Sequence, residues 1–204
     1  PNVPQFAVTM AGILRAGYTC VNVNPLYTAR ELEHQLKDSG ATTIVILENF
    51  AHTLQSVIDK TPITTVVVAS MGDLLGAAYG RWITFAVRHL AKMVPAYDIP
   101  LTNGRKVLTF SEVMSKGASL QLKPSTANLD STAFLQYTGG TTGLSKGAVL
   151  THRNIVAATL QAEAWFTPAL ARVGDLAKVN SIAALPLYHI FALTLCLLAI
   201  RQGS

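Results

Sequence analysis

The first seventy residues alternate between the helical and the extended hydrophobic period. The helical period covers residues 6–16 and the extended pattern covers residues 18–23, with a glycine between them. Thr28 and Glu31 have the spacing of a capping box, which predicts a second helix that begins there and reaches Gly40. A helix is therefore expected on each side of the first strand.

Two further apolar strands are predicted at residues 42–47 and 64–70, with a helix near residues 50–60 between them. Apolar strands separated by amphipathic helices predict a parallel sheet with both faces covered. The sequence therefore indicates an α/β fold, with parallel-rich sheets flanked by helices, that opens with a βαβ segment over residues 1–70.

Residues 73–97 carry an apolar stripe at three- and four-residue spacing if they form a helix. Its members are Tyr79, Trp82, Ile83, Ala86, Val87, Leu90, Met93 and Val94. Arg81, Arg88 and Lys92 fall on the opposite side. A basic amphipathic helix is typical of an interfacial anchor, which predicts peripheral contact of residues 75–96 with an anionic membrane. The alternative, and the commoner arrangement, is a surface helix whose stripe packs on the core.

Residues 71–131 look like an insertion or connector, with small polar residues and one short helix near 110–116. Order returns in a phosphate-loop segment over residues 132–204. It has a strand at 132–137, an extended stretch at 148–150, and a helix capped by Thr151.

The last apolar run, from Ile182 to Ile200, has nineteen uncharged residues and could span a membrane by length. Pro186, Tyr188 and His189 near its start favour a strand over 181–185, then a turn and a buried helix.

Composition adds limits rather than an identity. Only 13% of the residues are charged, which suggests an interior piece of a larger body or contact with lipid. The net charge of +5 favours anionic partners, although no nucleic acid is expected. Cys20 and Cys196 form no zinc or redox motif and are expected to be buried thiols in a reducing cytoplasm. The chain starts at Pro1 without an initiator methionine and stops directly after the apolar run, so we expect a piece of a longer protein.

Residues 137–148 read YTGGTTGLSKGA, and three kinds of site could contain such a stretch. A Walker loop needs a glycine before its lysine and a hydroxyl after it, whereas Lys146 stands between Ser145 and Gly147. A serine hydrolase could use Ser145 in G-x-S-x-G, with Asp175 and His189 following in triad order. That elbow requires a strand running directly into a helix, and the residues after this loop are extended.

A polyphosphate site fits the composition of the loop better. Closely spaced glycines let backbone N–H groups wrap an anion, threonine and serine hydroxyls add donors, and Lys146 adds a positive charge. The alternative of an exposed glycine-rich turn does not explain so many hydroxyls beside one lysine.

The stretch TGGTTGLSK at residues 138–146 is similar to the signature of the AMP-forming acyl-CoA synthetase, or adenylate-forming, superfamily. QYTGGTTGLSKGAVLTHRNIVA, from Gln136 to Ala157, resembles the bacterial long-chain fatty acid–CoA ligases in particular. Residues 22–41 and 185–194 resemble two further blocks of those ligases. Acetyl-, aryl- and amino-acid-activating relatives share the loop. The alternatives from other classes are a serine hydrolase using Ser145 and a non-catalytic membrane-associated piece.

The resemblance implies that the chain is an incomplete N-terminal adenylation domain of an enzyme that uses ATP, Mg²⁺ and coenzyme A to activate a fatty acid. The residues implied to surround the ATP phosphates are Tyr137, Thr138, Gly139, Gly140, Thr141, Thr142, Gly143, Leu144, Ser145, Lys146, Gly147 and Ala148. The acyl and carboxylate pocket would involve Tyr188, His189 and Phe191.

The same resemblance places other parts of the enzyme after residue 204. These parts bind adenine and ribose, supply an acidic magnesium ligand, and carry the catalytic lysine on a small C-terminal domain. We therefore expect no catalytic residue within the chain and no complete reaction by the chain alone. His152 and Arg153 could reach phosphate, but Thr151 capping the next helix is the favoured interpretation. His189 could equally be a satisfied core residue.

Overall fold

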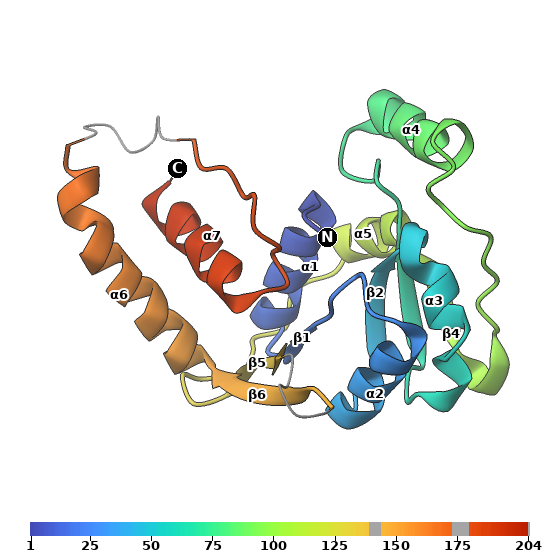
Figure 1. Ribbon diagram of the computed structural model, residues 1–204, viewed down its shortest axis with the longest axis horizontal. Helices are drawn as coiled ribbons and strands as arrows, with labels where there is room; N and C mark the ends of the chain where they lie inside the picture. The colour runs from blue at the N-terminus through green and yellow to red at the C-terminus, as the bar shows by residue number, and fades with distance from the viewer. Residues whose placement is uncertain (139–143, 173–179, 204) are drawn as a thin grey trace. The chain divides into compact units, whose positions relative to one another are not determined.

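The computed structural model describes residues 1–138, 144–172 and 180–203 (Figure 1). The chain forms two compact units. Unit 1 comprises Pro1–Asn2, Gly12–Asn22 and Ser125–Ser204, and unit 2 comprises Val3–Ala11 and Val23–Pro124. The first helix, α1 (Pro4–Arg15), contributes residues to both units.

Unit 2 contains a three-stranded parallel sheet in the order β2-β3-β4. Its strands are β2 (Thr43–Leu47), β3 (Thr65–Ala69) and β4 (Lys106–Thr109). Its helices are α2 (Ala29–Ser39), α3 (Ala51–Gln55), α4 (Ala77–Phe85) and α5 (Phe110–Ala118). The predicted parallel α/β architecture is confirmed, and so is the capping box that begins α2.

The core of unit 2 lies between this sheet and its helices. Leu54, Ile58 and Val66 are fully buried, with the apolar side chains of α2 and β2 around them. The helix predicted near 50–60 is shorter than expected, because α3 has five residues and a 3₁₀ turn lies on each side. Strand β4 was not predicted. It is four residues long and becomes a strand by pairing with β3, which its own pattern does not reveal.

The stripe at residues 79–94 does not pack on the core as the commoner arrangement would require. Tyr79, Trp82, Leu90 and Met93 are 60%, 55%, 63% and 59% exposed, and the helix gives way at residue 86 to a π turn that ends at Leu90. The expected core packing is therefore wrong for these four side chains.

Polar groups and glycines hold this segment to the rest of unit 2 instead. Gly80 approaches Gly72 so closely that a Cβ atom on either glycine would overlap the carbonyl oxygen of the other. Arg88 donates from Nε to Oε2 of the buried Glu48 at 2.8 Å, and this hydrogen bond raises the pKa of the guanidinium. The basic side chain thus faces the protein, which leaves the aromatic side chains outside.

Unit 1 has a three-stranded sheet in the order β1-β5-β6 (Figure 1). Strand β1 (Cys20–Asn22) runs parallel to β5 (Thr132–Thr138), and β5 forms an antiparallel pair with β6 (Lys146–Thr151). Helix α6 (His152–Leu170) follows β6 directly, and α7 (Ile190–Gln202) packs against α6. The strands predicted at 132–137 and 148–150 are confirmed.

The strand predicted at residues 181–185 is wrong. These residues form no ladder with the described strands, because the side chain of Asn2 satisfies the carbonyl groups of Ala183 and Leu185. A helix follows them as predicted, although only Ala192, Leu193 and Leu198 of α7 are buried. Among the described residues, no helix is both long and apolar enough to cross a membrane.

Candidate functional site

The glycine-rich stretch connects two antiparallel strands of unit 1. Thr138, the last residue of β5, lies opposite Lys146, the first residue of β6, and Tyr137 lies opposite Gly147. Gly139, Gly140, Thr141, Thr142 and Gly143 lie outside the described residues. The predicted phosphate-binding stretch therefore links the paired ends of β5 and β6, and these ends form the base of a hairpin.

The two sides of this hairpin base differ. Residues directly opposite in an antiparallel pair point to the same face, so Thr138 and Lys146 share one face, and both are exposed. Tyr137 is buried on the other face, and a Cβ atom on Gly147 would lie 3.0 Å from two of its ring carbons. Gly147 thus has a packing reason to be glycine, while Thr138 and Lys146 are free to face a ligand.

Three further residues of the predicted phosphate-binding set lie at the edges of the turn. Leu144 and Ala148 are exposed, and Ser145 is half-buried. Ala148 lies opposite Gln136, on the same face as Thr138 and Lys146.

A hydrogen bond joins this face of β5 to the second predicted block. Gln136 is buried, and its Nε2 donates to the backbone carbonyl of Tyr188 at 3.0 Å. Its Oε1 accepts from Nδ2 of the buried Asn22 on β1 at 3.2 Å. The fold therefore brings together three blocks that are far apart in the sequence, through two amide side chains.

Sequence reasoning did not identify Asn22 or Gln136 as part of the site. The available signal was a polar amide within each of two otherwise apolar strands, VNV and FLQY. A buried amide requires hydrogen-bond partners, so such a position indicates a specific tertiary contact.

His189 begins helix α7 instead of lying in the core. Its Nδ1 accepts a hydrogen bond from the backbone N–H of Phe191 at 3.3 Å, and the ring is exposed. Accepting at Nδ1 places the proton of the neutral ring on Nε2. Phe191 is 58% exposed and Tyr188 is half-buried, so the three predicted pocket residues lie together at the start of α7.

Asn2 holds the segment that leads into this block. Its Nδ2 donates to the carbonyls of Ala183 at 2.7 Å and Leu185 at 2.9 Å. Its Oδ1 accepts from the backbone N–H of Leu187 at 2.9 Å. One amide side chain thus fixes three backbone groups directly before Tyr188, a contact that no local pattern predicts.

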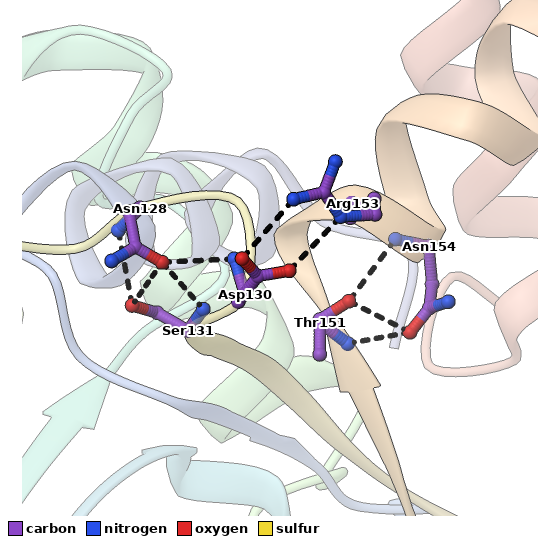
Figure 2. A network of polar contacts seen from close by, with 6 residues as sticks. All are labelled: Asn128, Asp130, Ser131, Thr151, Arg153 and Asn154. Atoms are coloured by element: carbon purple, nitrogen blue, oxygen red, sulfur yellow. Dashed lines mark hydrogen bonds and ion pairs between the residues drawn. The ribbon is translucent and has the colours of Figure 1, made fainter.

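The start of α6 is organised by a second polar network, shown in Figure 2. Thr151 forms a capping box with Asn154, as its Oγ1 accepts from the Asn154 N–H and the Asn154 side chain accepts from the Thr151 N–H. Arg153 donates to both carboxylate oxygens of Asp130, at 2.9 and 3.1 Å, and this pairing lowers the pKa of Asp130. The favoured structural interpretation of residues 151–154 is confirmed.

The local context excludes the two competing motifs. Ser145 directly precedes strand β6 and Lys146 is its first residue, whereas a Walker loop or a nucleophile elbow leads into a helix. Asp175, the residue considered for a triad, lies outside the described residues.

The described part of the chain can also be inspected for metal ligands and for reactive thiols. Those residues contain no group of three histidine, cysteine, aspartate or glutamate side chains that could hold a metal ion. Cys20 and Cys196 are free, and burial raises the pKa of Cys20 to about 12. Cys20 is buried as expected, whereas Cys196 is only half-buried.

Comparison with known proteins agrees with this arrangement. The model of the AMP-binding enzyme family matches residues 1–204. A long-chain-fatty-acid–CoA ligase of Yersinia pestis is 51% identical over 206 residues, which cover 100% of this chain and 35% of that protein. The chain thus spans about a third of the length of this relative.

Two solved structures show the same fold. A long-chain-fatty-acid–CoA ligase from Archaeoglobus fulgidus has a TM-score of 0.64 at 24% identity, covering 100% of this chain and 32% of that one. The A-PCP didomain of a carboxylic acid reductase from Segniliparus rugosus, in complex with AMP, has a TM-score of 0.68 at 19% identity, covering 98% and 26%. With the family match over its whole length, the chain belongs to the AMP-binding enzyme family.

Proposed function

We propose that a protein of the relatives' length containing this chain is a long-chain fatty acid–CoA ligase. The fatty acid carboxylate attacks the α-phosphate of ATP, which forms an acyl-adenylate and releases pyrophosphate. The thiol of coenzyme A then attacks the acyl carbon, which forms the thioester and releases AMP. In this proposal the chain supplies part of the N-terminal adenylation domain.

The hairpin turn would hold the β- and γ-phosphates of ATP. Thr138 and Lys146 flank the turn from one face. The attraction between the Lys146 ammonium and the pyrophosphate would strengthen as negative charge develops on this leaving group. Thr141 and Thr142 would add hydroxyl donors, and the turn glycines would add backbone N–H groups.

One observation supports the proposal above the others. The 3.0 Å hydrogen bond from Gln136 to the Tyr188 carbonyl attaches the block of Tyr188, His189 and Phe191 to the face of β5 that carries Thr138. Adenylation requires the carboxylate and the triphosphate to meet, so the two binding regions must share a face. His189 would shape the acid pocket without acting as a base, because a carboxylate is already ionised at neutral pH.

Magnesium and coenzyme A complete the proposed set of ligands. The described residues offer no group of three metal ligands, and we assign Mg²⁺ to the ATP substrate, whose phosphates it would accompany. We place the activity in the cytoplasm, which suits a chain with free cysteines.

We further propose that residues 75–96 contact the surface of an anionic membrane. The segment from Gly76 to Tyr97 carries Arg81, Arg88 and Lys92 and no acidic residue. Its exposed aromatic side chains include Trp82 and Phe85, whose ring centroids lie 6.0 Å apart. Aromatic rings together with basic residues suit the interface of a bilayer.

ATP–pyrophosphate exchange tests the ligase activity. It is measured on a protein of the relatives' length that contains this chain, with acetate, benzoate and palmitate as acids. We expect exchange that depends on palmitate. Lys146→Ala should lower it by roughly 10²-fold, the size of effect seen when one donor to a developing charge is lost. Lys106→Ala, which removes an exposed lysine from β4, should leave it unchanged. Exchange supported equally by acetate or benzoate would contradict the long-chain assignment.

A further inference from the structure

Unit 2 contains a cavity beside the exposed aromatic segment. Its volume is about 500 Å³, and it is lined by the residues after β3, by one side of α4 and the π turn, and by Ser111 of α5. Phe85 lines the cavity and is 49% exposed, and its ring lies 4.9 Å from that of His89, which also lines it. The cavity therefore borders the apolar surface formed by Trp82 and Phe85.

Both signs of charge face this cavity. Arg81 and Arg88 supply guanidinium groups, and Asp73 is the one carboxylate among the described lining residues. Arg81 has no hydrogen-bond or ion-pair partner within the described part of the chain. Arg88 uses Nε and Nη2 for Glu48 and Ser70, which leaves Nη1 without a partner among the described residues.

Asp73 is held in place by its own unit. One oxygen accepts from the Ser70 N–H at 2.7 Å and the other from the Ser111 hydroxyl at 3.4 Å. Each carboxylate oxygen has a second lone pair, so Asp73 can accept one more donor while it keeps these contacts. Asp73 would repel a purely anionic ligand. A ligand that also carries a positive group could place that group beside Asp73.

We propose that this cavity binds the headgroup of a phospholipid that carries a primary ammonium, of the phosphatidylethanolamine type. Its phosphodiester would accept from Arg81 and Arg88, and its ammonium would donate to Asp73. The glycerol and acyl chains would leave past Phe85 and Trp82 into the bilayer. This inference rests on the proposed membrane contact and names the lipid that the contact selects.

Co-sedimentation of the 204-residue chain with vesicles tests the inference. Three compositions are compared: phosphatidylcholine alone, phosphatidylcholine with phosphatidylglycerol, and the same fraction of phosphatidylglycerol with part of the phosphatidylcholine replaced by phosphatidylethanolamine. We expect phosphatidylglycerol to promote binding through charge, and phosphatidylethanolamine to strengthen it further at the same net charge. Asp73→Asn, which keeps an oxygen for the Ser70 N–H, should reduce that gain by about ten-fold, the value of roughly one charge-assisted hydrogen bond. Asp98→Asn, at an exposed acid outside the cavity, should not.

A second pair of variants tests the phosphate contact. Arg81→Gln should weaken binding to phosphatidylethanolamine vesicles roughly ten-fold. Lys92→Gln removes the same charge from the same segment outside the cavity, and its effect should be smaller and equal for all vesicles that carry the same net charge.

The failures of the two proposals have different signatures. Equal losses for Arg81→Gln and Lys92→Gln, or a gain with phosphatidylglycerol only, would overturn the cavity site and keep the membrane contact. Absence of binding to any vesicle would overturn the contact, and glycerophosphoethanolamine titrated into the chain by NMR would then decide the cavity. Chemical-shift changes at Ser70, Asp73 and Arg81 would support the site, and the absence of such changes would refute it.

Discussion

The two units of the protein are stabilised by different kinds of interaction. Unit 2 is built mostly from one continuous stretch, residues 23–124, around an apolar core whose central side chains are fully buried. Unit 1 assembles three separate stretches, and buried or multiply bonded amides of Asn2, Asn22 and Gln136 join them. The regular architecture thus follows from apolar packing, whereas the candidate site depends on a few directional hydrogen bonds.

The largest effect should come from the apolar core of unit 2. Leu54→Ala removes a fully buried side chain and should lower the free energy of unfolding by about 2–5 kcal/mol, through lost burial and the cavity left behind. Urea unfolding measures the loss. Leu160→Ala, at a 41% exposed position on α6, should change stability by less than about 0.5 kcal/mol. Similar losses for both variants would contradict the assignment of the stabilising core.

A smaller effect should separate the two partners of the ion pair in unit 2. Arg88→Gln leaves the buried Glu48 carboxylate without its cation and should cost about 2–3 kcal/mol. Glu48→Gln leaves Arg88, whose side chain is 44% exposed, to be solvated by water, and should cost only about 1 kcal/mol. Thermal unfolding of both variants gives the comparison, and the reverse order would show that Glu48 is reached by solvent.

In unit 1 the corresponding test is the Asn2 amide. Asn2→Ala removes three exposed hydrogen bonds and should cost about 1–2 kcal/mol, because water can replace part of each bond. Amide hydrogen exchange at Leu187 should accelerate. Asn2→Asp should destabilise more, since a carboxylate would then face the carbonyls of Ala183 and Leu185. Unchanged exchange of the Leu187 amide in both variants would contradict the role of Asn2 in fixing the backbone before Tyr188.

The smallest effect concerns Cys20. It tests whether unit 1, like unit 2, has an interior from which water is excluded. Burial raises the pKa of its thiol from 9.0 to about 12, so the folded state holds the proton more tightly than the unfolded state. The stabilisation is present in full below pH 9 and is lost as the pH rises from 9 towards 12.

Urea unfolding should therefore show a loss of about 1 kcal/mol at pH 10 relative to pH 8, and Cys20→Ala should remove this part of the slope. An identical slope in the variant would mean that solvent reaches the thiol. The comparison would then fail, because unit 1 would lack a buried apolar interior at β1.

The accuracy of the sequence-based predictions follows the range of the interactions involved. The capping box of α2, the Thr151 cap of α6 and strands β2, β3 and β5 depend on neighbouring residues and were predicted within a few positions. Strand β4 and the irregular residues 181–185 were missed, because the partner of each lies elsewhere in the chain. For β4 that partner is β3, and for 181–185 it is the side chain of Asn2.

The candidate site divides in the same way. The loop from Thr138 to Lys146 could be recognised because glycine spacing, hydroxyls and one lysine are local features. Asn22 and Gln136 could not be assigned, since a polar residue in an apolar strand predicts a partner without naming it. The side of residues 79–94 that faces solvent was likewise decided by Gly72 and Glu48, which precede the segment.

The sequence alone determined the α/β class and the position of the loop between β5 and β6, and it predicted polyphosphate binding for that loop, because hydrophobic period, capping and glycine spacing act within a few residues. The tertiary structure decided that the Tyr188 carbonyl bonds to Gln136, on the face of β5 that carries Thr138, and that Trp82 and Phe85 remain exposed. Both outcomes depend on hydrogen bonds and close backbone contacts between segments distant in the chain. Such contacts depend on which distant segments are brought together by folding, and a local sequence pattern does not identify those segments.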